Sequence, residues 1–384
     1  MRYQLRYVRI PVREGLTLAD TPPSCVGGLV REGLERQDGS VRTSAVAHLG
    51  GMWAWDPVEI TSDLGALNDG GRWAVVLPYT GMPVLVRFAH WSVTSPLETV
   101  GPWSGVAGSS WTSSLSEDEY IAGVRRIQDY IARGEVYQAN LCRVLTAEAG
   151  ANDDVVALHR MLIEGNPAPY GSMISVPEVD LHVVCASPEL FLRREGDVLS
   201  SGPIKGTAAS PSLLLDKDLS ENVMIVDLVR NDLSRVAKTG TVRVPDLLRI
   251  EEHPGLVHLV SDVECRLASR TAWSSIVQAT FPPGSVTGAP KSSALRIIDE
   301  CETAPREVYC GGVGWIDADR NAAEIAVAIR TFWVRDGQIR FGTGAGITWG
   351  SDPYGEWQET ELKARRLCGL ASQAVPASRT TSIR

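Results

Sequence analysis

Residues 309–347 contain three segments that are typical of β-strands and follow one another directly along the chain. They read YCGGVGWID (309–317), AEIAVAIRTFWV (323–334) and GQIRFGTGAGI (337–347), and runs of β-branched and aromatic residues favour strands. The segment EWQETELKARRL (356–367) then predicts a helix. Strands that follow strands, with helices in separate blocks, indicate an α+β fold rather than alternating βαβ units.

The same block pattern continues toward the N-terminus. Ser116 and Glu119 form a capping box ahead of apolar residues at helical spacing, and Gly134 lies at the stop position, so this segment is predicted to be a helix. Residues 217–237 predict a second long helix.

Asp218 or Ser220 is the expected cap of that second helix. Strands and turns are predicted within 73–79, 83–93, 136–148, 180–207, 241–253 and 258–267, and a loop that opens a helix within 281–302.

The composition divides the chain into unequal parts. Residues 1–115 are rich in short apolar segments, Gly and Pro and carry no catalytic pattern, which indicates a β-rich first part of the fold. The Ser/Gly-rich stretch 105–114 is interpreted as a linker. We expect residues 116–372 to form the catalytic domain and 373–384 to be a disordered tail.

Charge and cysteine content exclude several classes of protein. The net charge of −9 and the scattered basic residues disfavour a nucleic-acid or anionic-membrane partner, and no apolar run is long enough to span a membrane. Charges interrupt the N-terminal segment, which therefore does not resemble a signal peptide. The seven cysteines are odd in number, widely spaced and without C-x-x-C, so neither a disulfide framework nor a zinc site is predicted, and a reducing cytoplasm is the expected location.

Carboxylates on two predicted helices suit a magnesium site. Glu356 and Glu359 lie three residues apart and share a helix face with Lys363, while Glu221 opens the other long helix. Mg²⁺ prefers a few protein oxygens and retains open positions. The alternative is an exposed helix with an ordinary Glu–Lys pair.

Three basic residues are candidates for chemistry, each with a plainer alternative. Lys205 in PIKGT has apolar neighbours in the sequence, which could favour its neutral, nucleophilic form. The alternative is a solvated charge beside a turn. Arg330 in an apolar strand could bind a substrate carboxylate or form a buried pair with Asp. His258 is either a catalyst or a hydrogen-bonded core histidine.

The glycine-rich segment GTGAGI (342–347) does not match G-x-G-x-x-G, so a dinucleotide site is not supported. Its glycines could bring backbone N–H groups close to an anionic ligand, or they form tight turns.

Taken together, nine ordered segments over about residues 116–370 resemble the chorismate-utilising family, which comprises component I of anthranilate synthase and of aminodeoxychorismate synthase together with isochorismate and salicylate synthases. The segments are SPELF (187–191), PIKGT (203–207), ENVMIVDLVRNDLSRV (221–236), GLVHLVSDV (255–263), FPPGSVTGAPK (281–291), VYCGGVGWI (308–316), AIRT (328–331), GTGAGI (342–347) and EWQETELKA (356–364). The resemblance implies a sandwich of two antiparallel sheets with helices outside and the active site in a cleft.

The resemblance also implies roles for individual residues. Glu221 and Glu359 match the Mg²⁺ ligands, with Glu356 beside them, and Glu189 matches the general acid that protonates the departing C4 hydroxyl of chorismate. His258 matches a histidine near the reacting ring. Further substrate contacts are implied for Thr207, Tyr309, Arg330, Gly344, Ala345, Gly346 and Lys363.

Two positions distinguish the members of this family. Gln138 stands where water-using members carry a lysine base, and glutamine cannot take a proton from water. Lys205 stands where anthranilate synthases, which otherwise resemble this chain, have alanine, while aminodeoxychorismate synthases have this lysine. In that subfamily the lysine is thought to attack C2, so that ammonia attacks C4. The resemblance therefore implies amination of chorismate at C4, for 4-aminobenzoate and folate.

Some features leave alternatives open. The segment AASPS (208–212) replaces an arginine-containing stretch of the family, and GNPAPY (165–170) resembles a segment that lines a tryptophan pocket in relatives, without a clear matching N-terminal serine motif. No glutaminase pattern occurs, so a separate glutamine amidotransferase subunit is expected to supply ammonia. The alternatives are anthranilate synthase component I, a non-catalytic chorismate-binding relative, and the same amination in secondary metabolism.

Overall fold

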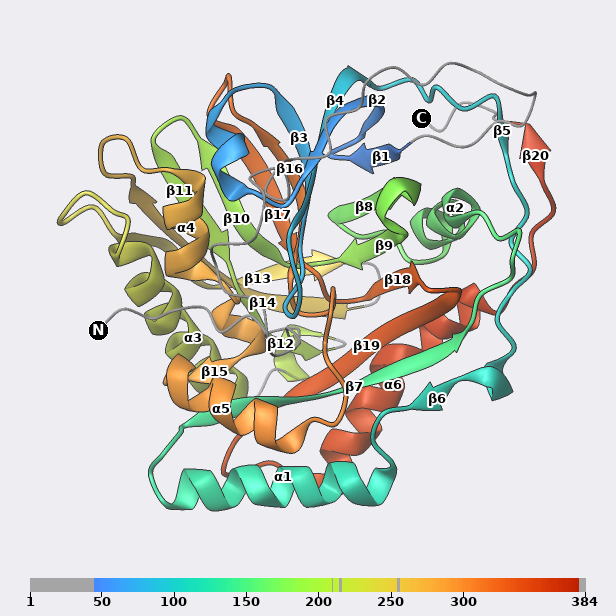
Figure 1. Cartoon of the computed structure of the whole chain (residues 1–384). Helices are drawn as coiled ribbons and strands as arrows, with labels where there is room; N and C mark the ends of the chain where they lie inside the picture. Colours follow the sequence, from blue (N-terminus) through green and yellow to red (C-terminus); the bar gives the residue numbers. More distant parts are fainter. Residues whose placement is uncertain (1–44, 209, 214–215, 254–255, 380–384) are drawn as a thin grey trace, which may run out of the picture.

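The computed structural model describes residues 45–379 apart from 209, 214–215 and 254–255 (Figure 1). Its strands pair antiparallel throughout and form two stacked parts. The first sheet contains β3 (Arg72–Leu77), β4 (Val84–Ser92), β10 (Leu190–Glu195), β11 (Val198–Gly202), β12 (Ile204–Ala208), β13 (Arg243–His253), β14 (Leu256–Arg266), β16 (Gly312–Asp317) and β17 (Ala322–Val327). The second sheet contains β1 (Val46–Leu49), β2 (Met52–Thr61), β6 (Thr112–Ser113), β7 (Gln138–Glu148), β8 (Tyr170–Val176), β9 (Leu181–Ser187), β15 (Gly288–Ala289), β18 (Thr331–Arg335) and β19 (Gln338–Ile347).

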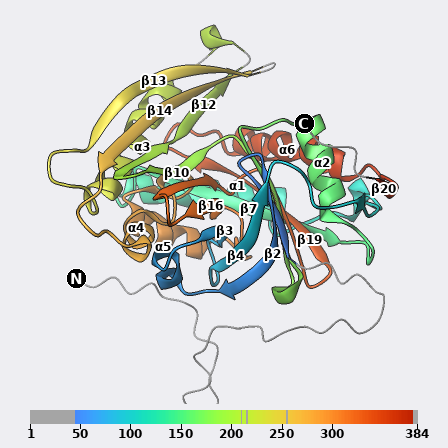
Figure 2. The same cartoon turned by 90° about the horizontal axis from the view of Figure 1, so that it is seen from above.

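The order of strands is continuous across both sheets. In the first sheet β14, β11, β10, β17, β16, β3 and β4 are successive neighbours. In the second sheet the order is β2, β1, β8, β9, β18, β19 and β7. Pairing of β2 with β4 joins the two sheets along one edge, and β13 and β14 form a long hairpin at another (Figure 2).

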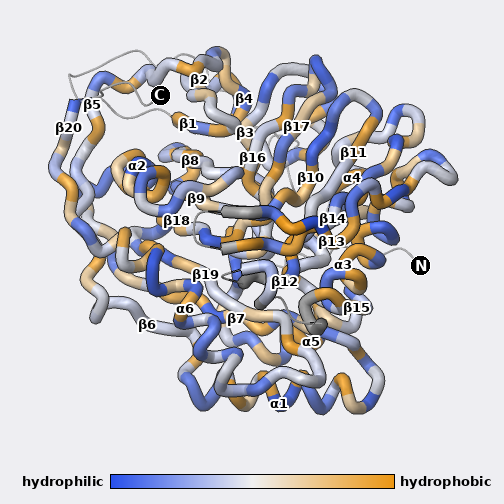
Figure 3. The backbone as a smooth tube through the Cα atoms, turned by 180° about the vertical axis from the view of Figure 1, so that it is seen from behind, coloured by the Kyte–Doolittle hydropathy of each residue, from blue (hydrophilic) through white to orange (hydrophobic). Residues whose placement is uncertain are grey.

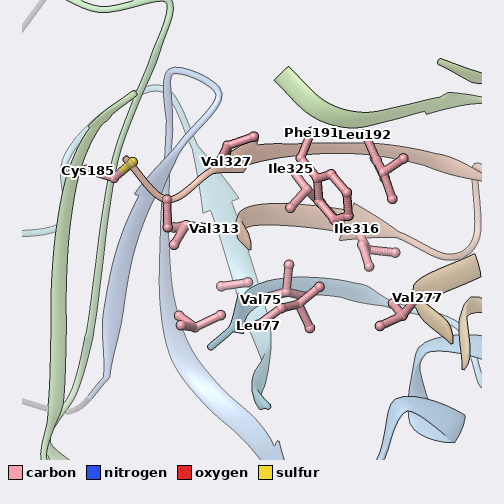
Figure 4. Close-up of a cluster of buried hydrophobic side chains, with 14 of the residues drawn as sticks. Val75, Leu77, Cys185, Phe191, Leu192, Val277, Val313, Ile316, Ile325 and Val327 are labelled. Carbon is pink, nitrogen blue, oxygen red and sulfur yellow. The ribbon is translucent and has the colours of Figure 1, made fainter. Parts of the chain in front are cut away.

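A large apolar core lies between the sheets, as the sandwich prediction requires. Val313 and Ile325 of the first sheet belong to the same buried cluster as Val183 and Cys185 of the second, and Figure 4 shows Cys185 beside Val313 and Val327. Burial of apolar surface of this kind is the main driving force for folding. The predicted α+β sandwich is therefore confirmed.

Helices cover the outside of the sheets. They are α1 (Glu117–Ala132), α2 (Val155–Gly165), α3 (Asp216–Ser234), α4 (Trp273–Thr280), α5 (Lys291–Cys301) and α6 (Pro353–Ala371). α3 packs against β14 of the first sheet, and α6 packs against β19 of the second. No helix in the described ranges is long and apolar enough to cross a membrane.

The sequence signals of α1 are all realised. Ser116 Oγ accepts from Glu119 N at 3.3 Å and Glu119 Oε2 accepts from Ser116 N at 2.8 Å, which is the predicted capping box. Gly134 follows the helix with φ +74°, a left-handed conformation that glycine adopts at low cost. Apolar and polar residues alternate along α1 (Figure 3), so one face is buried.

The predicted start of the second long helix is wrong. α3 begins at Asp216, so Asp218 and Ser220 lie inside its first turns rather than capping it. Three residues with capping side chains within five positions made the start ambiguous.

The predicted strand 323–334 is two strands, because the chain crosses between the sheets at 328–330. β17 pairs with β10 and β16 of the first sheet, whereas β18 pairs with β9 and β19 of the second. Arg330 makes the turn with φ +52°.

The stretch 105–114 is not a free linker. Val106 is buried and its N–H donates to the carbonyl of Ala371 at 3.0 Å, while β6 pairs with β7. The disordered tail predicted from 373 is also wrong for 373–379: Trp103 and Val375 exchange two backbone hydrogen bonds of 2.8 Å, and β20 (Ser378–Arg379) pairs with β5 (Thr99–Val100).

The first part of the described chain belongs to both sheets. β3 pairs with β16, and β1 pairs with β8. Strands from 46–92 thus complete the sandwich rather than forming a body of their own.

Candidate active site

Lys205 lies on β12 at the centre of a cluster of charged residues. Its Nζ donates to the carbonyl oxygen of Ser285 at 2.8 Å. Burial lowers the pKa of Lys205, and the charges of Glu189, Glu221 and Glu359 oppose this shift. The charge of Lys363 acts in the same direction as burial. The structure therefore brings together five predicted site residues from β12, the β9–β10 connection, α3 and α6.

Glu189 is buried next to this lysine, with 4% of its surface exposed. Burial raises the pKa of the Glu189 carboxyl, while a hydrogen bond with the Ser285 side chain and the charge of Lys205 partly oppose the rise. Its backbone is fixed, because Glu189 N donates to Ser187 Oγ and Glu189 O accepts from Val327 N. A carboxyl that keeps its proton to higher pH suits a general acid.

One face of α6 carries three of the predicted residues. Lys363 Nζ lies 2.6 Å from Glu359 Oε1, which is the Glu–Lys pair of the alternative to a magnesium site, and it also donates to the Gly344 carbonyl at 2.9 Å. Glu356, one turn earlier, is buried. The lysine thus joins α6 to the glycine-rich strand β19.

Glu221 is held in place through its neighbour. The Asn222 amide donates to the Leu259 carbonyl at 3.0 Å and accepts from Ser261 Oγ at 2.5 Å, which fixes α3 on β14. His258 is buried on β14, and in the β12–β14 register it lies opposite Thr207. The hydrogen bonds of Asn222 therefore set the position of Glu221 relative to His258 and β12.

Two of the predicted carboxylates, Glu221 and Glu359, could contribute to a magnesium site. Glu221 and Glu359 come from different helices and both are near enough to affect the pKa of Lys205. Among the described residues no three His, Cys, Asp or Glu side chains form a ready-made metal cage. Mg²⁺ commonly takes one or two carboxylates and fills its other positions with water and substrate oxygens, so these two glutamates are compatible with it.

Arg330 lies where the chain crosses between the sheets, and it is half-buried. Burial lowers the pKa of its guanidinium, and the charge of Arg366 lowers it further. No carboxylate in the described part of the chain pairs with Arg330, so the alternative of a buried Arg–Asp pair is not observed. A desolvated guanidinium beside a second cation favours an anionic ligand.

The glycines of β19 make room for side chains. A Cβ on Gly342 would lie 2.0 Å from Tyr309 Cγ, and one on Gly346 would lie 2.0 Å from Gln138 Nε2. Tyr309 is buried, and burial raises the pKa of its phenol well above the usual value. These glycines therefore lie in an extended strand rather than in tight turns, and Ala345 between them pairs with Leu141.

Sequence reasoning missed the residues that connect this cluster. Ser285 contacts both Lys205 and Glu189. Close by, Arg306 forms a buried bidentate pair with Glu302 and donates to the carbonyls of Val286 and Asn140. Ser285 lies in the segment FPPGSVTGAPK (281–291), which is one of the segments that resemble the family. The glycines of this segment did not indicate that the serine between them is a site residue.

A cavity of about 270 Å³ lies away from these residues and is lined by the segment 166–171. His48 and His159 border it, with His48 Nδ1 2.8 Å from His159 Nε2. Burial is the main cause that lowers the pKa of His159 to about 3, so His159 is neutral at ordinary pH, and burial also lowers the pKa of His48. None of the predicted site residues lines this cavity.

Residues 93–369 match the chorismate binding enzyme family. The chain belongs to this family. It is 39% identical to anthranilate synthase component 1 of Neisseria meningitidis over 279 residues, covering 69% of this chain and 56% of that protein. It is 38% identical to aminodeoxychorismate synthase component 1 of Klebsiella aerogenes over 272 residues, covering 67% of this chain and 59% of that protein.

Solved structures show the same fold. Anthranilate synthase component I from Streptococcus pneumoniae superposes with a TM-score of 0.70 at 22% identity, covering 90% of this chain and 95% of that chain. The menaquinone-specific isochorismate synthase of Escherichia coli gives 0.69 at 18% identity, covering 86% and 88%. The chain thus shares the fold of these enzymes, and its matches span a little over half the length of the curated relatives.

Proposed function

We propose that this chain is component I of an aminodeoxychorismate synthase, which converts chorismate and ammonia to 4-amino-4-deoxychorismate. The observation that carries the proposal is the environment of Lys205. Its ammonium is desolvated, so its pKa is lowered, and the protonatable carboxyl of Glu189 is beside it. A nucleophilic amine and a general acid are thus available at the same place.

In the proposed reaction the neutral Lys205 amine attacks C2 of chorismate, and the C4–O bond breaks as both ring double bonds shift. Glu189 gives its proton to the departing C4 oxygen, which leaves as water. Ammonia then attacks C4, both ring double bonds shift back, and the C2–N bond to Lys205 breaks. The lysine leaves as the neutral amine and the new C4 ammonium returns a proton to Glu189, so the net change is replacement of the C4 hydroxyl by an amino group.

Other residues would bind and orient the substrate. The guanidinium of Arg330 suits the enolpyruvyl carboxylate, because no protein carboxylate among the described residues competes for it. Glu221 and Glu359 would hold Mg²⁺, with Glu356 beside them, and the bound ion would neutralise the ring carboxylate. Lys363 would hold the Glu359 carboxylate and the Gly344 carbonyl in fixed positions relative to each other.

Anthranilate synthase component I is the second candidate, since the relative from Neisseria meningitidis with that name is 39% identical. In that reaction ammonia attacks C2 directly, and a lysine reaching C2 would obstruct it. Lys205 therefore favours C4 amination.

The ammonia would come from a separate glutamine amidotransferase subunit, in keeping with the "component 1" names of the relatives. The product would serve 4-aminobenzoate and folate synthesis, or the same amination would serve secondary metabolism. A cytoplasmic location is in keeping with the free thiols of all six described cysteines.

The test is incubation of the chain with chorismate, Mg²⁺ and ammonium chloride at high pH, with products identified by mass and fluorescence. We expect a product that a 4-aminobenzoate-forming lyase converts further. Direct release of anthranilate would refute the proposal in favour of the second candidate.

A further inference from the structure

Lys291, the first residue of α5, has a buried ammonium group that uses all of its donors. Its Nζ donates to Asp232 Oδ2 at 2.5 Å, to the carbonyl of Pro282 at 2.8 Å and to that of Thr280 at 3.0 Å. The side chains of Lys291 and Asp232 are 17% and 5% exposed. An ammonium group has three N–H donors, so Lys291 joins α3, the end of α4 and the following loop at one point.

The loop 281–287 lies against one face of α3. Leu228 and Asp232 are four residues apart on this helix and therefore share that face. A Cβ on Gly284 would lie 2.7 Å from Leu228 Cδ2, so the middle of the loop approaches α3 closely. The position of the loop on α3 is thus set by close packing at its middle and by the bonds of Lys291 at its start.

The loop is a compact turn with hydrogen bonds of its own. Val286 N donates to the Pro283 carbonyl at 3.3 Å, and Thr287 Oγ1 donates to the same carbonyl at 3.1 Å. Thr287 N donates to the Gly284 carbonyl at 3.2 Å. Because these bonds close the turn around Ser285, a shift at the start of the loop is passed on to that serine.

Ser285 connects this turn to the reacting groups. Its carbonyl accepts from Lys205 Nζ at 2.8 Å, and its side chain hydrogen-bonds the Glu189 carboxyl. Glu189 and Asp232 both line one small cavity of about 20 Å³, together with Ser285. The buried Lys291–Asp232 pair therefore lies close to the site and is connected with it through Ser285.

Stability alone does not account for a buried ion pair at this place. Taking two charges out of water costs about as much as their attraction returns, and apolar residues of similar size are often as stable or better. Burial lowers the pKa of Lys291 and raises the pKa of Asp232, and the charge of each group opposes the shift of the other. An apolar pair could not provide three directed hydrogen bonds from one atom, two of them to the backbone of the loop and its approach.

We propose that Lys291 is a positioning residue for the amination reaction, and this inference rests on the proposed function. It fixes the place of the loop before β15 through two backbone carbonyls of that segment. Ser285 then holds the Lys205 amine and the Glu189 carboxyl at the separation that the reaction requires. An error of about 1 Å in such geometry can reduce turnover by about a hundredfold.

The experiment compares two variants that differ only at Lys291, with chorismate, Mg²⁺ and ammonium chloride as in the test of function. Asp232→Asn removes the carboxylate charge, and Lys291, even as a neutral amine, still has N–H donors for both carbonyls. Its kcat for chorismate consumption should therefore stay within about threefold of wild type. Adding Lys291→Met removes these donors, so kcat should fall by at least about a further tenfold, while KM for chorismate changes less than about twofold.

Two further variants separate positioning from stability. Asp232→Leu combined with Lys291→Met replaces both charges by apolar groups of similar size, so the melting temperature should not fall. Its kcat should nevertheless fall as far as in Asp232→Asn/Lys291→Met. Lys238→Met makes the same change at an exposed lysine beyond the end of α3 and is the control, in which kcat, KM and the melting temperature should stay unchanged.

Three results would overturn the role of Lys291. One is an equal kcat in Asp232→Asn and Asp232→Asn/Lys291→Met. Another is a loss of kcat in Asp232→Asn that is already as large, because the charge and not the carbonyl contacts would then matter. The third is a fall in kcat with an equal rise in KM and a lower melting temperature in Asp232→Leu/Lys291→Met, which identifies a purely structural pair.

The same measurements distinguish this inference from the proposed function. Anthranilate as the wild-type product would refute the proposed function, but a difference in kcat between the two Asp232→Asn variants would still support the positioning role of Lys291. A wild-type chain that consumes no chorismate refutes both.

Discussion

Lys205 and Glu189 are joined through a single residue, Ser285. The Ser285 carbonyl accepts from Lys205 Nζ at 2.8 Å, and its side chain hydrogen-bonds the Glu189 carboxyl. The nucleophile and the acid of the proposed reaction therefore share one anchor on the loop before β15, and displacement of that loop affects both.

Removal of the Lys205 amine tests the regiochemistry. Lys205→Ala should lower 4-amino product formation by at least about 10³-fold, as loss of a covalent nucleophile does, or redirect nitrogen to C2. Product identity by mass and fluorescence is the measurement, and Lys238→Ala at an exposed position is the control. Unchanged formation of the 4-amino product in Lys205→Ala would show that the lysine is not the nucleophile.

The pH profile should be bell-shaped, because the reaction needs Lys205 neutral and Glu189 protonated. Activity should be lost at low pH, where Lys205 is protonated, and at high pH, where Glu189 is ionised; burial lowers the pKa of Lys205 and raises that of Glu189, which brings the two pKa values closer together and increases the fraction of the active form. Because Lys205 and Glu189 interact, the two apparent pKa values of the profile belong to the pair and not to either residue alone. In Glu189→Gln the alkaline limb should disappear along with most of the activity; if that limb persists, another group is the acid.

Loss of the Arg330 charge should weaken chorismate binding. Arg330→Gln removes a guanidinium that no described carboxylate neutralises, so KM for chorismate should rise by about tenfold to a hundredfold. Arg335→Gln on the exposed end of β18 should leave KM unchanged. Equal KM values for wild type and Arg330→Gln would show that this arginine does not bind chorismate.

Metal binding can be measured without turnover. Mn²⁺ titrated in the presence of chorismate and followed by electron paramagnetic resonance should bind to the wild type and be weakened at least about tenfold in Glu359→Ala. Glu117→Ala, on the exposed start of α1, is the control. Activity without any divalent ion would refute the magnesium assignment.

The buried pair of Arg306 and Glu302 should dominate the stability of this region. Arg306→Leu leaves the Glu302 carboxylate buried without its partner and should lower the free energy of unfolding by about 3–5 kcal/mol. Arg126→Leu, which breaks the exposed pair with Glu300, should cost less than about 1 kcal/mol. Denaturant unfolding is the measurement, and similar losses in the two variants would contradict the expectation.

Elements that depend on residues close together in the sequence could be predicted from the sequence alone. The capping box and Gly134 predicted α1, and the spacing of Glu359 and Lys363 predicted their pair on α6. The break between β17 and β18 was not predicted, because the apolar run around Arg330 contains neither Gly nor Pro and the break follows from pairing with different sheets.

The site was predictable only as separate residues. Lys205 and Glu221 could be selected from motifs, but Ser285 lies 80 residues from Lys205 and 145 from Asn140. Such contacts depend on the closed sandwich and leave no periodic signal. The proximity of Gln138 to Gly346 likewise depends on the register of β7 with β19.

The crossing of the chain at 328–330 has a thermodynamic consequence. β17 on one side of Arg330 belongs to the first sheet, and β18 on the other side belongs to the second. An anion held by this arginine at its positive-φ turn is bound at the joint between the two layers. A ligand that binds only the folded state stabilises that state by mass action. Bound substrate should therefore raise the free energy of unfolding of the two-sheet sandwich.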